Sequence, residues 1–371
     1  MTFQEIFGQY TWEEISQQIY GKEGADVRFA LHKKGKRDLH DFMALLSPAA
    51  ESFLEEMAVL SQKITQRRFG KVIQMYIPLY LSNECQNICT YCGFSLTNPI
   101  NRLTLTPEQV LSEVDIIKGY GFDHILLVTG ESTHVDLSYF QEILDAIRPF
   151  FSQISMEVQP LKESEYCQLI AAGLSAVYVY QETYGPLYAN YHPKGRKRDF
   201  EYRLTTPDRL GQAGIHKIGL GCLLGLDDWR TDSWFTGLHL DYLEKKYWKT
   251  KFSISFPRIR PATGCIEPQV ILSNRQMVQL ICAYRIFNAN VELSLSTRET
   301  ENFRDHVVAL GITSMSAGSK TDPGGYSQQE KALEQFTIED SRSPQKIASI
   351  LQSSGYEAVW KDWDIAIDMT T

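Results

Sequence analysis

From residue 71 onward, the sequence alternates between short apolar runs and amphipathic segments that have helical spacing. Several of the helix-like segments end in glycine just before the next apolar run, as helices commonly do. The apolar runs predict eight strands, at Val72–Tyr80, His124–Thr129, Ile154–Val158, Ala176–Tyr180, Lys217–Gly221, Phe252–Phe256, Val291–Ser296 and Ile312–Ser316. This alternation predicts a parallel (βα)8 barrel of the TIM type, with an open doubly wound sheet as the alternative.

Two further segments flank the predicted barrel. Residues 1–70 predict an N-terminal helical extension, in which Thr11 and the pair Ser47-Pro48 have the chemistry of helix starts. The barrel core is expected over residues 71–320. A short C-terminal segment is expected over residues 321–371, where Ser343-Pro344 opens a helix.

Composition argues against two classes of protein. A net charge of −8 over 371 residues disfavours a general nucleic-acid binder, which usually carries a basic face. The basic runs His32–Arg37 and Lys194–Arg198 predict solvated loops. No apolar run reaches the ~18 residues of a membrane span, and the first residues lack a secretory signal. Seven cysteines, an odd number, predict no disulfide framework and therefore a reducing cytoplasm.

Three of these cysteines lie together in a loop after the first predicted strand. Cys85, Cys89 and Cys92 have the spacing C-x3-C-x2-C. Three thiolates are one fewer than a structural zinc or a fully ligated iron–sulfur cluster takes. A cubane on three cysteines leaves one iron open to an outside ligand, and the alternative is a zinc knuckle or a buried patch.

Polar residues follow other predicted strands, at the end of a barrel where active sites lie. Glu157 and Gln159 end the third strand, and a buried carboxylate there needs a ligand or a structural hydrogen-bond network. Arg258 and Arg298 follow the sixth and seventh strands. Because guanidinium binds carboxylate bidentately, they predict an anionic substrate group such as an amino-acid carboxylate, with rim salt bridges as the alternative.

The cysteine spacing, with Tyr91 just before the last cysteine, resembles the signature of the radical S-adenosylmethionine (SAM) superfamily. The resemblance implies a [4Fe–4S] cluster on Cys85, Cys89 and Cys92, whose open iron chelates SAM. Electron transfer from the cluster then cleaves SAM to methionine and a 5′-deoxyadenosyl radical. The resemblance also implies a set of SAM-binding residues, namely Tyr91, Thr129, Gly130, Glu131, Glu157, Glu182 and Arg203.

Individual roles follow from the same resemblance. Thr129-Gly130-Glu131 stands where the superfamily has a Gly-Gly-Glu-type motif, and Thr129 departs from that pattern. The motif implies backbone contacts to the SAM ammonium. Glu182 would contact the ammonium or ribose side of SAM, and Arg203 the carboxylate or its surroundings. Glu157 would meet ribose hydroxyls or substrate groups.

Beyond the cysteine loop, stretches such as Met156–Pro160, Val179–Thr183 and Leu293–Glu299 are similar to the tyrosine lyase family of bacterial thiamine-thiazole biosynthesis, the 2-iminoacetate synthases. That resemblance implies cleavage of the Cα–Cβ bond of L-tyrosine to 2-iminoacetate and p-cresol. It implies thiazole synthase and an electron donor such as flavodoxin or ferredoxin as partners. The tyrosine lyase of iron-only hydrogenase maturation is the rival. It carries a second, C-terminal cysteine cluster, whereas no cysteine follows Cys282 here.

Overall fold

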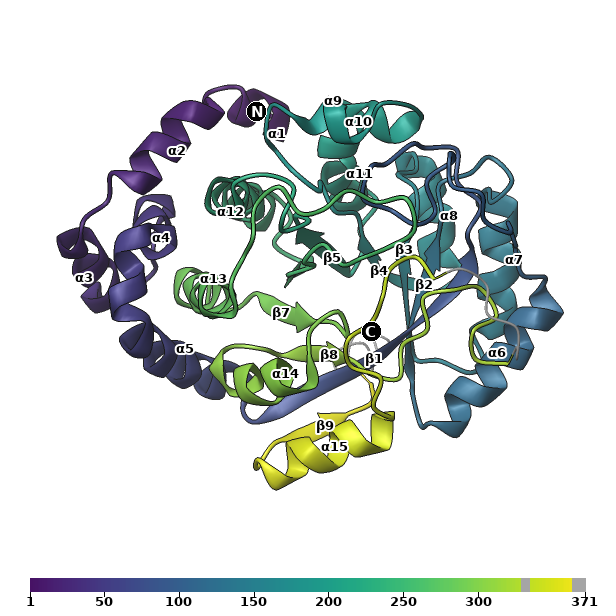
Figure 1. Cartoon of the computed structure of the whole chain (residues 1–371). Coiled ribbons are helices and arrows are strands. Elements are labelled where there is room, and N and C mark those ends of the chain that lie inside the picture. The colour runs from purple at the N-terminus through teal and green to yellow at the C-terminus, as the bar shows by residue number, and fades with distance from the viewer. Residues whose placement is uncertain (328–333, 362–371) are drawn as a thin grey trace.

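A closed barrel of eight parallel strands forms the centre of the molecule (Figure 1). The computed structural model describes residues 1–327 and 334–361. The barrel strands are β1 Val72–Ser82, β2 His124–Thr129, β3 Gln153–Glu157, β4 Leu174–Tyr178, β5 Lys217–Gly221, β6 Lys251–Ser255, β7 Glu292–Leu295 and β8 Ser314–Ser316. Each strand pairs with its neighbour in chain order, and β1 pairs with both β2 and β8. The predicted barrel is therefore confirmed, and the open sheet is excluded.

The first strand, β1, has 11 residues and pairs with three other strands. Its residues 77–82 pair with β2, its residues 74–76 pair with β8, and its residues 72–74 pair with β9 (Glu357–Val359). Asp123 N, just before β2, donates to Trp360 O at 3.1 Å, so β9 continues the line of β2 along β1. The C-terminal segment is thus joined to the barrel by its backbone.

The sequence also predicts barrel helices that start at Thr106 and at Ser273, and the structure confirms both starts. Thr106 and Ser273 accept hydrogen bonds from backbone N–H groups at the starts of two of them. The helices that follow strands are α6 Pro107–Gly119, α7 Leu137–Ile147, α8 Glu163–Ala171, α11 Thr206–Gln212, α12 Trp229–Lys246, α13 Asn274–Phe287 and α14 Glu301–Val307. The sequence predicts this last helix from Arg298 to Leu310, but α14 begins three residues later, at Glu301, because Thr300 caps it. Arg298 therefore lies in the loop after β7 rather than on a helix.

Residues 1–70 are helical, as predicted, and pack on the barrel helices (Figure 1). The elements are α1 Phe3–Phe7, α2 Trp12–Tyr20, α3 Gly24–His32, α4 Leu39–Leu46, a 3₁₀ turn at Pro48–Phe53, and α5 Leu54–Phe69. Because α2 and α4 cover the outer side of α12, that helix is buried on nearly all sides. One hydrophobic core extends from Phe3 to Tyr356, so the three-part division of the chain stays a prediction.

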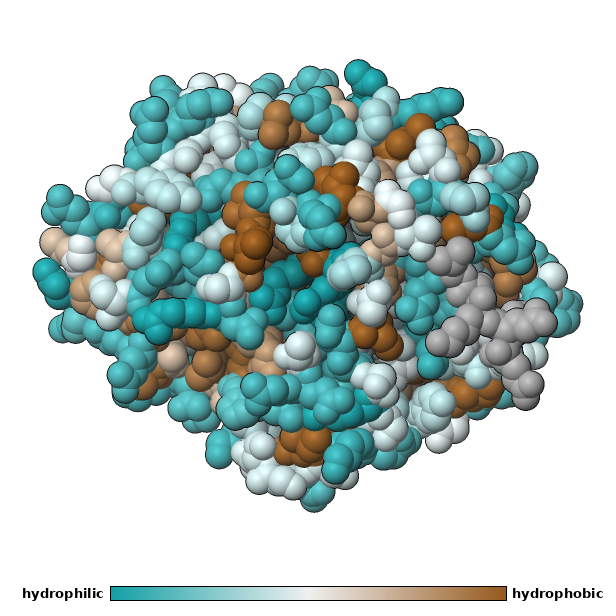
Figure 2. Space-filling view, in the orientation of Figure 1, coloured by the Kyte–Doolittle hydropathy of each residue, from teal (hydrophilic) through white to brown (hydrophobic). Residues whose placement is uncertain are grey.

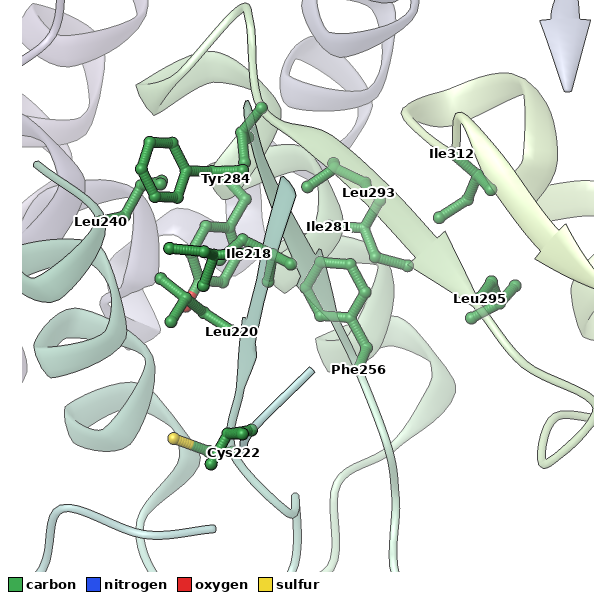
Figure 3. Packing of buried hydrophobic residues seen from close by; sticks show 14 of the residues in the cluster. Ile218, Leu220, Cys222, Leu240, Phe256, Ile281, Tyr284, Leu293, Leu295 and Ile312 are labelled. Carbon is green, nitrogen blue, oxygen red and sulfur yellow. The ribbon is translucent and has the colours of Figure 1, made fainter. Parts of the chain in front are cut away.

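The core lies between the strands and the helices around them. Figure 3 shows side chains of β5, β7 and α13 meeting there, among them Ile218, Ile281 and Leu293. On the face shown in Figure 2, hydrophobic side chains form small patches separated by hydrophilic ones. Within residues 1–327 and 334–361, no helix has the length and apolar character required to cross a bilayer.

Truncation of a core side chain tests this packing. Ile281 is fully buried, so Ile281→Ala should lower the free energy of unfolding by about 2–5 kcal/mol. Ile271 is 84% exposed. Ile271→Ala should therefore change the free energy of unfolding by less than about 0.5 kcal/mol. Urea denaturation followed by circular dichroism measures both, and equal shifts would contradict the assigned core.

Candidate active site

The three clustered cysteines line one cavity at the carboxyl ends of the strands. Cys85 and Cys89 are buried, Cys92 is partly buried, and all three are free thiols. The loop is held by its backbone, since Ile88 N donates to Lys194 O at 2.9 Å and Thr90 N to Tyr191 O at 3.1 Å. Burial raises the pKa of each thiol above its usual value, so the thiols need a nearby cation to ionise.

The number of thiols limits the metal group that the loop could hold. In the described part of the chain, no three His, Cys, Asp or Glu side chains converge as ligands of a single ion. A cubane does not require such convergence, because each thiolate binds a different iron. The three thiols therefore fit a cluster held at three corners.

Gly130 brings the second strand end against the cysteine loop. A Cβ atom at this position would lie 2.2 Å from Glu84 O and 3.0 Å from Cys85 Cβ, so only glycine fits. Gly130 N donates to Ser82 O, and Gln86 N donates to Glu131 O, both at 2.9 Å. The predicted motif Thr129-Gly130-Glu131 is thus packed directly beside the cysteines.

Four buried charged side chains form a network beside the cysteine loop. Arg203 Nη1 contacts Glu131 Oε1 at 2.8 Å and its Nη2 lies 3.9 Å from Glu182 Oε1, while Lys197 Nζ contacts that same Glu182 oxygen at 2.6 Å. Asn87 Nδ2 donates to the other Glu131 oxygen at 2.8 Å. Two anions and two cations balance, so the network is neutral without a ligand.

The electrostatics of the network follow from burial and pairing. Burial alone would raise the pKa of Glu131, but Arg203 and Lys197 outweigh it and hold that pKa below its usual value. Arg203 Nε also donates to Tyr180 O at 2.7 Å, which fixes the guanidinium under the end of β4. Glu131 is therefore an ionised carboxylate in the cavity wall at neutral pH.

Glu182 lies in a strained turn. Its φ of 70° is the one positive value found for a non-glycine residue among the residues described. The carboxylate of Asp232 holds the turn by accepting from Thr183 Oγ1 at 3.1 Å and from Tyr184 N at 2.7 Å. The turn directs the Glu182 carboxylate toward Lys197 and Arg203.

Lys197 corrects the sequence interpretation of the run Lys194–Arg198 as a solvated loop. Its side chain is 12% exposed, and it lies 5.6 Å from the ring centroid of Tyr91. Lys194, in the same run, is exposed as predicted. No local signal distinguished the two lysines, because Lys197 is buried by Glu182, 15 positions earlier in the same connection, and by the cysteine loop, which is distant in sequence.

Tyr91 lies under the same network. Its hydroxyl contacts His192 Nε2 at 2.8 Å, and His192 Nδ1 contacts Tyr188 O at 2.7 Å. Burial lowers the pKa of His192 to about 2, so this ring is neutral and only positions Tyr91.

Glu157 and Arg298 also line the cavity, but they are not part of the network. Burial raises the pKa of Glu157 to about 7, and the charge of Arg298 offsets this only in part. Arg298 Cζ lies 3.3 Å from the centroid of the Phe336 ring, and its Nη1 makes one long contact of 3.4 Å to Arg258 O. Among described residues, neither charge has an ion-pair partner within 4 Å.

Two predicted residues do not reach the cavity. Arg258 forms a bidentate pair with Glu299, with Nε to Oε1 at 2.8 Å, and it donates to Leu272 O at 3.0 Å. Its N–H groups are therefore used at the barrel rim, as the alternative interpretation, a rim salt bridge, predicted. Gln159 donates to Val135 O at 2.5 Å and is structural.

Comparison with known proteins identifies the family. Residues 79–233 match the Radical SAM superfamily, and residues 255–357 match the Biotin and Thiamin Synthesis associated domain. The chain is 51% identical to the 2-iminoacetate synthase of Escherichia coli, over 98% of this chain and 97% of that protein. The protein of that name from Salmonella typhimurium is 50% identical over the same shares. This chain belongs to the 2-iminoacetate synthase family.

Solved structures agree with this family fold. HydG, a maturase of the [FeFe]-hydrogenase, superposes with a TM-score of 0.91 at 30% identity, over 96% of this chain and 81% of that chain. HydG from Carboxydothermus hydrogenoformans gives a TM-score of 0.84 at 31% identity, over 94% of this chain and 80% of that chain. As a radical SAM enzyme, this 2-iminoacetate synthase family member uses a [4Fe–4S] cluster and SAM.

The cavity of this family member has room and polar groups for these cofactors. Thr129 Oγ1, Ser319 Oγ and Arg260 Nε are buried, line the cavity and have no hydrogen-bond partner within residues 1–327 and 334–361. Buried polar groups are rarely left unpaired, so these atoms point to a polar ligand. The three thiols and these unpaired groups fit a cluster and a polar cofactor.

Removal of Lys197 should unbalance the buried network. Lys197→Met leaves Glu182 with Arg203 at 3.9 Å as its cation, and we expect the free energy of unfolding to fall by about 3–5 kcal/mol. Lys194→Met changes an exposed lysine of the same run and is the matched control. Urea denaturation of the apoprotein measures both, and equal stabilities would show that the network is dispensable for folding.

Proposed function

We propose that this chain cleaves the Cα–Cβ bond of L-tyrosine, yielding 2-iminoacetate and p-cresol. SAM is converted to 5′-deoxyadenosine and methionine in the same reaction, and the 2-iminoacetate supplies the glycine-derived unit of the thiamine thiazole. The observation that carries this proposal is that three free thiols and an arginine without a carboxylate partner line the same buried cavity. The 51% identity to a 2-iminoacetate synthase over nearly the full chain supports it.

Residues of the chain divide into two groups in this proposal. Cys85, Cys89 and Cys92 hold the cluster. The SAM-binding group is taken to be Tyr91, Thr129, Gly130, Glu131, Glu182 and Arg203. When bound, the cluster and SAM supply a 5′-deoxyadenosyl radical that starts the reaction. The network of Glu131, Glu182, Lys197 and Arg203 offers both charge signs to the amino and carboxylate groups of SAM.

The substrate occupies the part of the cavity near β7 in this proposal. Arg298 binds the tyrosine carboxylate, because its guanidinium lines the cavity and packs on Phe336 without a carboxylate partner among the described residues. Burial lowers the pKa of Arg298 below its usual value, yet an arginine remains charged at neutral pH. In this proposal the cavity walls would protect a carbon radical from solvent, and the contacts to Arg298 would place the substrate at reacting distance.

Two partners complete the proposed pathway step. An electron donor such as flavodoxin or ferredoxin is required, because the cleavage of SAM takes an electron from the cluster, which must then be reduced again. Thiazole synthase is the proposed recipient of 2-iminoacetate, since an imine hydrolyses in water and needs prompt use.

The similarity to HydG keeps a second candidate function in view. HydG superposes with a TM-score of 0.91, and a tyrosine lyase of hydrogenase maturation, which shares the first half of the reaction, is the alternative; the identity of 30% to HydG supports it less than the 51% identity supports a 2-iminoacetate synthase. Iron analysis separates the two candidates. One cluster on Cys85, Cys89 and Cys92 gives about four irons per chain, whereas a second cysteine-bound cluster adds to that count.

Product analysis tests the proposed function. Anaerobically reconstituted protein, given SAM, a reductant and L-tyrosine, should release p-cresol and glyoxylate, the hydrolysis product of 2-iminoacetate. Cys85→Ala should abolish both products and 5′-deoxyadenosine, because it removes a ligand of the cluster. Cys167→Ala changes an exposed cysteine and should leave the products unchanged. Cleavage of SAM without p-cresol would point to a different substrate.

Replacement of Arg298 tests the substrate site. Loss of a charge-assisted hydrogen bond costs about 2–3 kcal/mol, so Arg298→Gln should lower kcat/KM for tyrosine roughly 30- to 150-fold. The KM for SAM should change little. Arg275→Gln, at an exposed position on α13, serves as the control. A rise in the KM for SAM with an unchanged KM for tyrosine would move Arg298 to the cofactor site.

A further inference from the structure

Two opposite charges face the cavity from opposite sides of the barrel. Glu157 is the last residue of β3, and Arg298 follows β7. The strands follow one another around the barrel from β1 to β8. Counted in either direction around this ring, β7 is the fourth strand from β3. Both residues line the cavity, and they influence each other's charge without forming a salt bridge. A space flanked by one anion and one cation therefore lies across the barrel mouth.

The nearest hydroxyl groups do not satisfy Glu157. Three tyrosine hydroxyls around it have other partners. Tyr80 donates to Gln335 Oε1 at 2.7 Å, Tyr180 donates to Ser255 Oγ at 3.0 Å, and Tyr76 accepts from Ser294 Oγ at 3.2 Å. No hydrogen bond to the Glu157 carboxylate comes from residues 1–327 or 334–361. A half-buried carboxylate without a donor is costly, so this group is suited to a donor that arrives with a ligand.

We infer that Glu157 and Arg298 clamp the zwitterionic α-amino-acid end of the substrate, with Glu157 receiving the α-ammonium and Arg298 the carboxylate. This inference rests on the proposed function and deepens it. It assigns Glu157 to the substrate rather than to the ribose of SAM. Each charge then gains the partner that the protein does not provide, and the substrate is held at both ends of its backbone.

The alternative, a role for Glu157 at the SAM ribose, is less well supported by the contacts. The residues proposed for SAM are joined by ion pairs, with Glu131 and Glu182 both tied to Arg203. Glu157 makes no ion pair with that network in the described chain. Among charged groups, Arg298 has the largest influence on Glu157.

The clamp predicts that tyrosine binding depends on pH, because Glu157 must be charged to pair with the ammonium. The groups that face Glu157 are Arg298, Glu182, Lys197, Arg203 and the phenols of Tyr76, Tyr80, Tyr178 and Tyr180. Burial raises the pKa of Tyr76, Tyr80 and Tyr180 above 10, so these phenols stay neutral near neutrality. Burial also raises the pKa of Glu157 to about 7, so below that pH it is neutral and cannot pair with an ammonium. Binding of tyrosine should strengthen as the pH rises through about 7.

Substrate analogues separate the two ends of the clamp. The reconstituted enzyme is assayed with L-tyrosine, and two competitive inhibitors are compared: 3-(4-hydroxyphenyl)propanoate, which lacks the amino group, and tyramine, which lacks the carboxylate. Glu157→Gln should raise the KM for tyrosine on the order of 10- to 100-fold. It should leave the KM for SAM and the inhibition constant of the propanoate within about twofold, because neither uses Glu157. Arg298→Gln should instead leave the inhibition constant of tyramine unchanged, because tyramine lacks the carboxylate.

Other outcomes overturn the clamp. A raised KM for SAM with an unchanged KM for tyrosine would assign Glu157 to the cofactor, and an equal loss for tyrosine and the propanoate would remove the ammonium contact. If Glu157→Gln fails to retain iron, the pH dependence of binding to the wild-type enzyme tests the clamp instead. Its affinity for tyrosine should rise with pH through about 7 relative to its affinity for the propanoate, and parallel profiles would contradict the clamp. Wild-type enzyme that forms no p-cresol, but shows this difference, would refute the proposed substrate and leave the clamp standing.

Discussion

The hydrogen bonds between β1 and β2 are the interaction on which the rest of the structure depends. They close the sheet into a barrel, and the closure brings the carboxyl ends of eight strands around one space. The cysteine loop follows β1 and Gly130 follows β2, so the same closure packs the two against each other. Residues separated by more than 200 positions, such as Cys85 and Arg298, line one cavity as a result.

Charge is distributed unevenly within that cavity. On the side of the cysteine loop, two carboxylates and two cations neutralise one another, with a contact of 2.6 Å between Lys197 and Glu182. Farther across, Glu157 and Arg298 lack ion-pair partners within the described chain. A paired network can position a cofactor without a large penalty for burial, whereas unpaired buried charges are stabilised only when a ligand of opposite charge arrives. The two regions therefore differ in what they can bind.

Much of the fold could be predicted because its signals are local. All of the predicted strand boundaries lie within two residues of the observed ones, since apolar runs and glycine stops mark them. Helix starts at Thr106 and Ser273 were predictable from their capping side chains. The start of α14 was wrong by three residues, because the cap is Thr300 rather than a residue nearer Arg298. The environment of Arg258 was not predictable, since its partner Glu299 follows another strand. That of Lys197 was not predictable either, because its partner Glu182 lies 15 positions earlier in the same β4–β5 connection, and only the structure gives the course of that connection.

By itself, the sequence determined the barrel, the cysteine spacing and the resemblance to radical SAM lyases, because periodicity, turn chemistry and motif spacing are properties of neighbouring residues. Only the tertiary structure decided which charges are paired. It buried Lys197 in the wall of the site, turned Arg258 to the rim and left Glu157 facing Arg298. The reason is that an ion pair depends on the distance between side chains that are not neighbours in the sequence, and barrel closure and the course of the connecting segments set that distance.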